Sequence, residues 1–335
     1  MKPLNIPREY DSSEKLKKIS RVLVTGVAGF MGSHLAERFI SDGVEVVGID
    51  NFSCGFMENL ENLVKKKEFH LVKGDIRKIA DLQRSMKEVE GVLHFAAQSS
   101  VPKSAENPLE DFEVNVRGTL NVLECARKLD VGVVIFASSS TVYGVTEVLP
   151  TDENQPILPI SNYGASKAAA EAFCASYSAL YDIKTANLRY YNIYGPRSRR
   201  GVMFDLLEKL RKNWRELEVL GDGKQTKDYL YISDAVDATM LIIEKGRLKG
   251  EAYNVGYGRN FSVSEIVEEI LKITGLAGKT KIRYTGKSWP GDVPVTLADI
   301  SKLKSLGFRP KVSLGDGLRK FIDWYEKTYG CVGAK

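Results

Sequence analysis

Residues 21–32, RVLVTGVAGFMG, contain the pattern that decides the fold of this chain. Their first six residues are rich in β-branched side chains and end in glycine, which predicts a short buried strand. Gly26, Gly29 and Gly32 separate this strand from an amphipathic stretch that stops at Gly43, so we expect a tight turn and then a helix. Such a turn lets the backbone approach a pyrophosphate closely and places the phosphate charge on the helix N-terminus.

Strand-like and helix-like segments alternate along the chain beyond this turn. Further strands are expected at 44–50, 69–75, 91–97, 131–140 and 184–195, with a long helical stretch over 107–129. Continuous apolar strands that alternate with helices predict an α/β fold with a doubly wound parallel sheet of Rossmann type, buried on both faces. The rhythm breaks after 195, and we expect a smaller mixed α/β lobe there, closing over the strand ends.

A carboxylate stands at the end of the second predicted strand. Asp50 lies 24 residues after Gly26, where it can accept both ribose hydroxyls of adenosine and repel a 2′-phosphate. No arginine stands beside it, since Asn51 and Phe52 follow, so NAD is predicted in preference to NADP. Asp75, after the third strand, is placed either to meet the adenine ring or to cap a helix, and both interpretations stay open.

Composition argues against several classes of function. A net charge of +5 over 335 residues is mild, so no nucleic-acid partner is predicted. No run of eighteen apolar residues exists, and the first twenty residues lack the apolar stretch of a secretory signal, so we expect no membrane association. The cysteines and histidines show no spacing that indicates a metal site or a disulfide framework, which favours a reducing cytoplasm.

The segment 163–167, YGASK, places a phenol and an amine one helical turn apart. Ser161 and Asn162 are candidate caps of the helix that carries Tyr163 and Lys167 on one face. A phenol with a pKa near 10 is a poor base, and we expect the ammonium and the positive ring of oxidised NAD to lower that pKa. An ordinary exposed pair is the alternative. The hydroxyl run at 138–141, SSST, ends the preceding strand and supplies a hydrogen-bonding partner for a substrate oxygen.

Eight segments together resemble the extended short-chain dehydrogenase/reductase family. They are TGVAGFMGSH, GIDNFSCG, HFAAQSSVPKS, SSSTVYG, YGASK, LRYYNIYGPR, GDGKQTKDYLYISD and PGDVPVTLADISK. They occur in the family's order between residue 21 and about residue 325. More narrowly, they resemble the family's nucleotide-sugar epimerase branch, which UDP-glucose 4-epimerase typifies.

The resemblance implies an enzyme with tightly bound NAD that epimerises C4 of a UDP-hexose through a 4-keto sugar. Tyr163 would be the base, Lys167 would lower its pKa and bind the nicotinamide ribose, and Ser139 would complete the catalytic set. The cofactor-binding positions that it implies are Gly26, Gly29, Phe30, Met31, Gly32, Asp50, Asn51, Asp75, Ile76, Phe95, Ala96, Ala97, Asn115, Tyr163, Lys167 and Tyr190. The substrate-binding positions are Ser99, Ser139, Ser140, Asn192, Lys227, Trp289, Asp292 and Thr296.

Departures from the family pattern bear on the reaction and the sugar. Ser140 and Thr141 stand where 4,6-dehydratases carry an Asp-Glu pair, and the decarboxylases have Glu at the second position, so both reactions are disfavoured. Lys227 and Trp289 replace two arginines that typically grip the diphosphate. Thr296 stands where a small residue admits an N-acetyl group at C2, which extends the expected substrates to UDP-GlcNAc and UDP-GalNAc.

The arginines or lysine expected to compensate for these changes are Arg197, Arg199, Arg200 or Lys287. Three parts of the chain are expected: an N-terminal extension (1–19), an NAD-binding domain (20–190) to which later segments return, and a mainly nucleotide-sugar-binding lobe (191–335). The alternatives are a UDP-glucuronate 4-epimerase, a keto-sugar reductase of the same fold, or a non-catalytic NAD-binding regulator. The intact set of Ser, Tyr and Lys argues against the regulator.

A homodimer is expected from the resemblance, through the helices that follow Pro108 and Tyr163. The apolar residues expected on these helix faces are Phe112, Val116, Leu120 and Phe173. A monomer that buries the same faces within one chain is the alternative.

Overall fold

The computed structural model describes residues 19–286 and 293–333. The expected N-terminal extension falls almost wholly outside these ranges, and so do Lys287, Trp289 and Asp292. Within the described ranges, no helix combines the length and the apolarity that a bilayer crossing requires.

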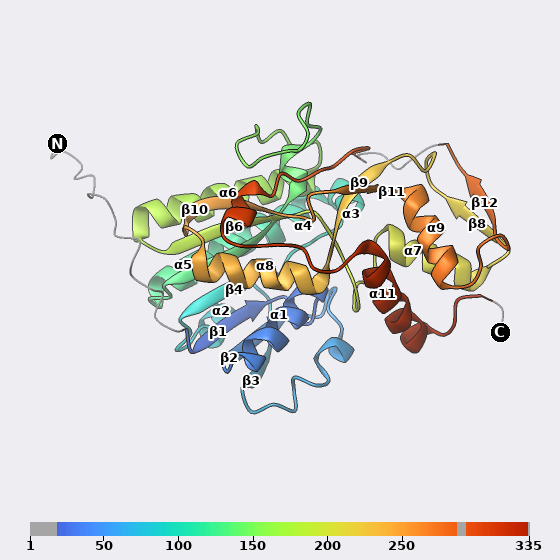
Figure 1. Cartoon of the computed structure of the whole chain (residues 1–335). Coiled ribbons are helices and arrows are strands. Elements are labelled where there is room, and N and C mark those ends of the chain that lie inside the picture. Colours follow the sequence, from blue (N-terminus) through green and yellow to red (C-terminus); the bar gives the residue numbers. More distant parts are fainter. Residues whose placement is uncertain (1–18, 287–292, 334–335) are drawn as a thin grey trace.

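A parallel sheet of seven strands forms the centre of the structure, as the alternating pattern predicted (Figure 1). The strands are β1 (Arg21–Thr25), β2 (Glu45–Asp50), β3 (Phe69–Lys73), β4 (Gly91–His94), β5 (Val133–Ser139), β6 (Lys184–Tyr190) and β10 (Lys249–Val255). Their order is β10-β6-β5-β4-β1-β2-β3. The chain runs outward from β1 to β3 and returns on the other side of β1 as β4, so the topological switch point lies between β1 and β4.

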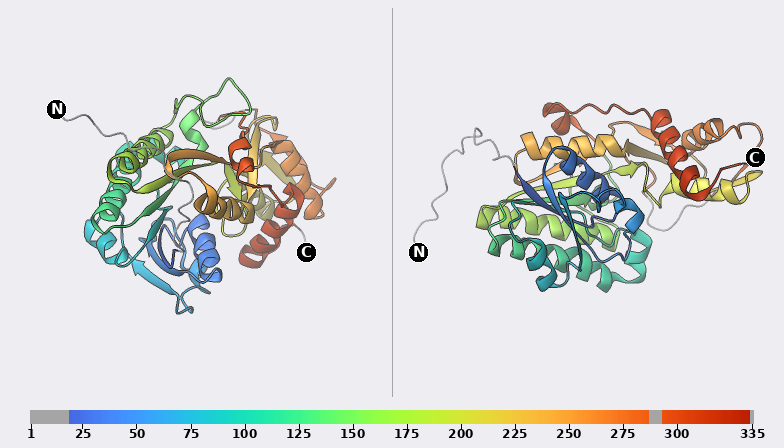
Figure 2. Two further views of the ribbon diagram at one scale, coloured as in Figure 1. Left: turned by 60° about the vertical axis from the view of Figure 1, so that its left-hand side comes forward. Right: turned by 90° about the horizontal axis from the view of Figure 1, so that it is seen from below.

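Helices cover both faces of this sheet (Figures 1 and 2). On one face, α1 packs against α8; the other face carries α2, α5 and α6, with α3 and α4 against α6. The bounds of these helices are α1 (Phe30–Ser41), α2 (Ile79–Ser85), α3 (Val101–Glu106), α4 (Pro108–Phe112), α5 (Gly118–Lys128), α6 (Asn162–Tyr181) and α8 (Ile232–Lys245). Short helix η1 (Met57–Leu60) follows β2, and α10 (Ser301–Ser305) packs against β10.

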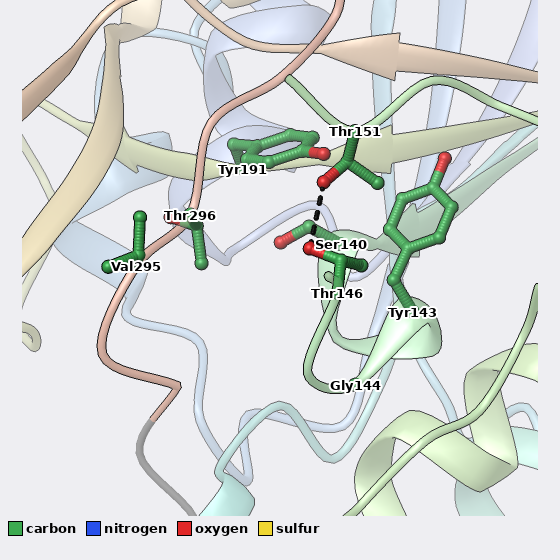
Figure 3. Close-up of a pocket in the computed structure, with 8 residues that line it drawn as sticks. All are labelled: Ser140, Tyr143, Gly144, Thr146, Thr151, Tyr191, Val295 and Thr296. Atoms are coloured by element: carbon green, nitrogen blue, oxygen red, sulfur yellow. Dashed lines mark hydrogen bonds between the residues drawn. The ribbon is translucent and has the colours of Figure 1, made fainter. Parts of the chain in front are cut away.

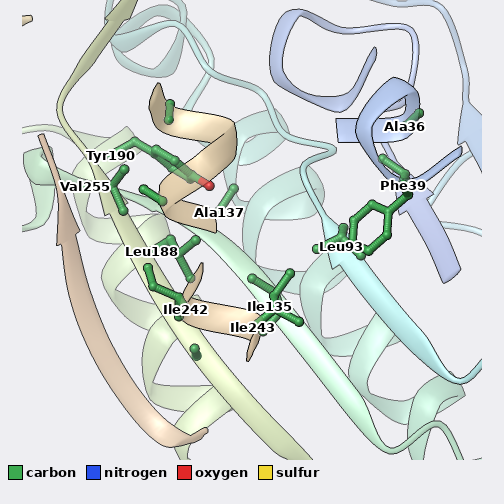
Figure 4. Packing of buried hydrophobic residues seen from close by; sticks show 14 of the residues in the cluster. Ala36, Phe39, Leu93, Ile135, Ala137, Leu188, Tyr190, Ile242, Ile243 and Val255 are labelled. Carbon is green, nitrogen blue, oxygen red and sulfur yellow. The ribbon is translucent and has the colours of Figure 1, made fainter. Parts of the chain in front are cut away.

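The core reflects the two-residue repeat of the strands. Leu93 and Ile135 pack with Phe39 of α1 in the cluster shown in Figure 4. Their strand neighbours Val92 and Val134 belong to a separate cluster under α5 and α6. Successive side chains of a strand point to opposite faces, so each apolar strand contributes to both layers and must be apolar throughout.

A smaller lobe lies beyond the carboxyl ends of the strands (Figure 1). Its helices are α7 (Val202–Lys212), α9 (Val263–Ile273) and α11 (Leu314–Tyr329). They pack with a three-stranded sheet, β11-β9-β7, and a two-stranded sheet, β12-β8. The bounds of these strands are β7 (Asn192–Tyr194), β8 (Glu216–Val219), β9 (Thr226–Tyr231), β11 (Asn260–Ser262) and β12 (Lys281–Tyr284).

Two predicted elements are divided in the structure. The single strand expected over 184–195 is two strands, because the chain leaves the central sheet at Tyr191 and crosses to the small lobe, where β7 pairs with β9. The helical stretch over 107–129 consists of α4, a π-helical turn η2 (Glu113–Arg117) and α5. A π turn accommodates an extra residue, and Asn115 within it turns its side chain toward the loop after β4.

The glycine turn between β1 and α1 lies directly against the end of β4. Gly26 has a φ of +68°, and a Cβ there would lie 2.7 Å from the backbone nitrogen of Ala96. The backbone N–H groups of Phe95 and Ala96 both donate to the Thr25 hydroxyl, at 3.1 and 3.0 Å. The turn and the β4 loop are therefore locked together at the switch point, with no room for a side chain between them.

Gly26→Ala should destabilise the protein more than Gly43→Ala. Both glycines have positive φ, at +68° and +79°, but a Cβ at Gly43 meets nothing within 4 Å. We expect Gly43→Ala to cost about 1–2 kcal/mol of backbone strain, and Gly26→Ala about 3 kcal/mol or more because the β4 loop must also shift. Urea unfolding of both variants measures the difference, and equal losses would contradict the close packing.

Candidate active site

Asp50 lies at the carboxyl end of β2, where the sequence predicted a ribose-binding carboxylate. Its Oδ2 accepts the backbone N–H of Ala28 at 2.9 Å, and its Oδ1 accepts that of Phe52 at 2.8 Å. Burial raises the pKa of Asp50, and these two hydrogen bonds act against that rise. A Cβ at Gly55 would lie 2.9 Å from Oδ1, so the glycine leaves space beside the carboxylate. Each oxygen has a second acceptor position, and the residues therefore fit the ribose diol of a dinucleotide.

Asp75 does not cap a helix, which makes that interpretation wrong. Helix α2 begins four residues later, and its N-cap is Lys78. Asp75 instead binds the Arg77 side chain through two nitrogens, at 3.0 and 2.7 Å, and accepts the Arg77 backbone N–H. Asn51 of the β2 loop donates to the same carboxylate at 3.0 Å. Hydrogen bonds from Arg77 hold the pKa of Asp75 well below its usual range, so this edge of the predicted adenine site carries a fixed anion.

Three of the expected cofactor residues are held by contacts within the protein. Asn115 is buried; its amide donates to the backbone oxygen of Gln98 at 2.9 Å and its oxygen accepts the Gln98 N–H. The Tyr190 hydroxyl is hydrogen bonded to the Thr239 hydroxyl at 2.7 Å, and burial raises the pKa of that tyrosine. The side chain of Ile76 belongs to the core under α5. Asn115 therefore fixes the loop after β4, whatever contacts it makes with a cofactor.

The phenol and amine lie on the first turns of α6, facing the end of β5. Ser161 caps the helix as predicted, since its hydroxyl oxygen accepts the N–H of Gly164 at 3.1 Å. Lys167 is buried, its Nζ donates to the backbone oxygen of Ala137 at 2.9 Å, and it lies 5.8 Å from the centroid of the Tyr163 ring. The alternative of an exposed surface pair is therefore wrong.

The protein's own groups raise the pKa of the phenol, contrary to the expected lowering. Desolvation of its hydroxyl raises the pKa of Tyr163 to about 12, and a hydrogen bond with Ser139 acts against this rise. The Lys167 ammonium lies over the Phe136 ring, 4.8 Å from its centroid, and burial lowers its pKa to about 8. A phenolate at neutral pH therefore needs a further positive charge, which the ring of an oxidised nicotinamide would supply.

The hydroxyl run after β5 folds as a 3₁₀ turn, η3 (Ser140–Tyr143). The oxygen of Ser139 accepts both the backbone N–H of Thr141 at 3.2 Å and the Thr141 hydroxyl at 3.0 Å. These two bonds use its acceptor positions and leave its own hydrogen to be donated. The turn thus orients Ser139 as a donor toward the side of the site where Tyr163 lies.

A pocket opens beside this turn (Figure 3). Its lining is Ser140, Tyr143, Gly144, Thr146, Thr151, Tyr191, Val295 and Thr296. Sequence reasoning identified Ser140 and Thr296 but missed the other hydroxyl-bearing members, because they come from loops far apart in the chain and belong to no single motif. In Figure 3 the Tyr191 ring and the Thr151 side chain flank the pocket. A wall rich in hydroxyls suits a sugar, which is recognised through hydrogen bonds.

The expected diphosphate-binding positions lie on two paired strands of the small lobe. The amide of Asn192 on β7 donates to the backbone oxygen of Asp228 at 3.1 Å, and Lys227 on β9 donates to the backbone oxygen of Val293. Lys227 thus spends part of its donor capacity within the protein. Trp289 and Asp292 lie outside the described residues.

The three arginines after β7 reach different partners. Arg200 donates to the hydroxyl of Ser99 at 2.8 Å, whereas Arg199 stacks on the Phe56 ring, 3.6 Å from its centroid. Arg197 pairs with a carboxylate of α1. Arg200 is exposed, and its charge acts to lower the pKa of the catalytic tyrosine. Of the three, Arg200 is the one bound to a predicted substrate residue.

A family model described as GDP-mannose 4,6 dehydratase matches residues 23–321. The chain belongs to this family. The membership confirms the extended short-chain dehydrogenase/reductase family that the motifs predicted. A putative UDP-glucose 4-epimerase of Methanocaldococcus jannaschii is 39% identical over 92% of this chain and 99% of its own length.

Solved structures agree with this assignment. The UDP-glucose 4-epimerase of Thermotoga maritima, determined with UDP-glucose, matches with a TM-score of 0.84 and 34% identity over 92% of this chain and 99% of its own. The UDP-glucuronic acid 4-epimerase of Bacillus cereus, in complex with UDP-glucuronic acid and NAD, matches with a TM-score of 0.86 and 31% identity over 92% of this chain and 100% of its own.

Dehydratases are also among the relatives. The dTDP-D-glucose 4,6-dehydratase of Homo sapiens is 31% identical over 92% of this chain and 91% of its own length. The chain is therefore an enzyme of the short-chain dehydrogenase/reductase family whose relatives are nucleotide-sugar epimerases and dehydratases.

Proposed function

We propose that the protein interconverts UDP-glucose and UDP-galactose by NAD-dependent epimerisation at C4, through a 4-keto sugar. The observation that carries this proposal is the hydrogen-bonded pair of Ser139 and Tyr163, set beside a hydroxyl-lined pocket. Dehydration needs an acid and a base besides this pair, and Ser140 and Thr141 supply no carboxyl group where they stand. The cofactor is NAD, which solved relatives hold and which the surroundings of Asp50 fit.

The residues present support both halves of the reaction. When bound, NAD accepts a hydride from a sugar carbon and returns one to it. The Tyr163 oxygen takes the proton of the C4 hydroxyl, and the Ser139 hydroxyl stabilises the sugar oxygen by a hydrogen bond as C4 becomes a ketone. After the sugar has turned its other face, Tyr163 returns the proton. One proton and one hydride leave and come back, so no external oxidant is consumed.

Tyr163→Phe should abolish most turnover while NAD stays bound. The ring remains, but the oxygen that moves the proton is lost, and we expect kcat to fall by about a hundredfold or more. Conversion of UDP-galactose, followed by chromatography without added cofactor, measures this loss, and the absorbance of the protein reports its NAD content. Tyr181→Phe, on the far end of α6, is the matched control and should keep full activity. An active Tyr163→Phe enzyme would remove the proposed base.

We propose further that the C2 side of the sugar site accepts an N-acetyl group. Thr296 lines the pocket, and its position is fixed because its N–H donates to the backbone oxygen of Thr226 and its hydroxyl accepts the N–H of Asp228. A short side chain at this fixed point leaves space that a larger one would fill. UDP-GlcNAc and UDP-GalNAc therefore join the proposed substrates.

Thr296→Tyr should separate the two kinds of substrate. The ring would enter the pocket, so we expect conversion of UDP-GlcNAc to fall by more than about tenfold while UDP-glucose stays within about threefold. Thr296→Ser keeps the hydroxyl and the small size, and should convert both as before. Comparing kcat/KM for the two sugars across these variants tests the assignment. Parallel losses for both sugars in Thr296→Tyr would show that the residue does not select at C2.

We also propose a homodimer that buries neighbouring faces of α4 and α6. Leu109, Phe112 and Phe173 are 77%, 50% and 36% exposed on these two helices, which pack against each other. Val116, expected on the same face, is buried within the chain, and Leu120 packs against the core under α5. The π turn rotates the positions after Phe112 inward, so the exposed apolar face is shorter than the sequence predicted.

Phe112→Asp should weaken the dimer by placing a charge at the centre of that face. Sedimentation velocity over a range of concentrations measures the shift toward monomer. Leu220→Asp, an equally exposed apolar position in the small lobe at 48%, is the control and should leave the association unchanged. A wild-type protein that sediments as a monomer at all concentrations would rule out the proposal.

A further inference from the structure

A buried ion pair lies directly behind the Ser139–Tyr163 pair and has no role in the chemistry proposed above. Arg189 of β6 and Glu171 of α6 have side chains only 5% exposed. Two guanidinium nitrogens of Arg189 donate to the Glu171 carboxylate, at 3.0 and 2.7 Å. Burying both charges costs hydration that their attraction barely repays, so stability alone does not explain the pair.

Glu171 joins the catalytic helix to the end of β5. It follows Tyr163 by eight residues and Lys167 by four, so all three share one face of α6. Its carboxylate accepts the hydroxyl hydrogen of Ser138, the residue just before Ser139. Since Tyr163 and Glu171 belong to one continuous helix, the bond to Ser138 fixes where Ser139 stands relative to the phenol.

Arg189 extends the same network to the wall of the sugar pocket. Its Nη1 donates to the hydroxyl oxygen of Tyr143 at 2.9 Å, and its guanidinium carbon lies 4.8 Å from the centroid of that ring. The Tyr143 hydroxyl donates in turn to the side-chain oxygen of Asn254 on β10, at 2.7 Å. Tyr143 lines the pocket and closes η3, so the ion pair holds both ends of the segment that carries Ser139 and Ser140.

We propose that Glu171 and Arg189 are positioning residues that set the distance between the Ser139 hydroxyl and the Tyr163 phenol. The pair carries no net charge, so it orients the site without adding a field of one sign. Every donor and acceptor named in the network has a partner, which is the condition under which a buried polar cluster rigidifies a structure. The effect on turnover rests on the proposed function; the geometry does not.

Ser138→Ala tests the contact with the smallest change, because it removes only the hydroxyl that Glu171 accepts. Thr185→Val is the matched control: Thr185 is fully buried, and its hydroxyl donates to the backbone oxygen of Cys174 on the same helix at 3.0 Å, at the other end of the sheet. Both variants lose one hydroxyl between a strand and α6, so we expect similar decreases in Tm. Only Ser138→Ala should lower kcat, by about tenfold or more, with KM within about threefold.

Two further readouts separate positioning from mere stability. Ser138→Thr restores a hydroxyl and should recover most of kcat. Glu171→Gln removes the negative charge that raises the pKa of Lys167, so the alkaline limb of its kcat–pH profile should move to lower pH. Equal kcat values for Ser138→Ala and Thr185→Val, or no recovery in Ser138→Thr, would overturn the inference.

Titration of the phenol tests the geometry without any substrate. Ultraviolet difference titration of the protein against its Tyr163→Phe variant reports the pKa of Tyr163, which the Ser139 hydrogen bond lowers. In the Ser138→Ala background this pKa should rise because Ser139 is displaced, while in Thr185→Val it should stay unchanged. If UDP-sugars are not converted but the titration shifts as expected, the proposed function fails and the positioning stands. An unshifted titration refutes the positioning.

Discussion

The contact between helix α6 and the carboxyl end of β5 is the constraint on which the site depends. Apolar packing of Ala170 and Cys174 against the sheet brings the helix to the strand but leaves it able to slide along its axis. Hydrogen bonds from Lys167 to the Ala137 backbone and from Ser138 to Glu171 remove that freedom. Because a hydrogen bond weakens within a few tenths of an ångström, two of them one helical turn apart fix the register of the helix.

Burial that gives the site its geometry also works against its chemistry. Desolvation favours the neutral form of each group, raising the pKa of Tyr163 to about 12 and lowering that of Lys167 to about 8. A base that removes a hydroxyl proton near neutral pH needs the opposite. The compensating charge must therefore arrive with the oxidised dinucleotide, so the tyrosine becomes an effective base only when a hydride acceptor is beside it. Proton removal and hydride removal are coupled by electrostatics.

The sequence predicted those parts of the structure that depend on neighbours in the chain. The strand, turn and helix around Gly26, the carboxylate at Asp50 and the cap at Ser161 are local patterns, and the structure has all three. Contacts across the fold left no such pattern. Arg189 within an apolar strand and Glu171 within an alanine-rich helix each signalled a buried charge, but nothing in the sequence paired them. The pocket wall likewise joins 143–151 with residue 191, which only the crossing from β6 to β7 brings together.

The segment that crosses between the lobes is tied to each loop around the predicted dinucleotide site. Arg197 pairs with Glu37 on α1, Arg199 stacks on Phe56 of the β2 loop, and Arg200 binds the loop after β4. Single surface pairs contribute little, but all three must break before the small lobe can move away from the strand ends. Epimerisation returns its hydride in every cycle, so the cofactor has no reason to leave. A cleft closed by several weak ties suits a dinucleotide that stays, while the sugar exchanges through the hydroxyl-lined pocket on the other side of Tyr163.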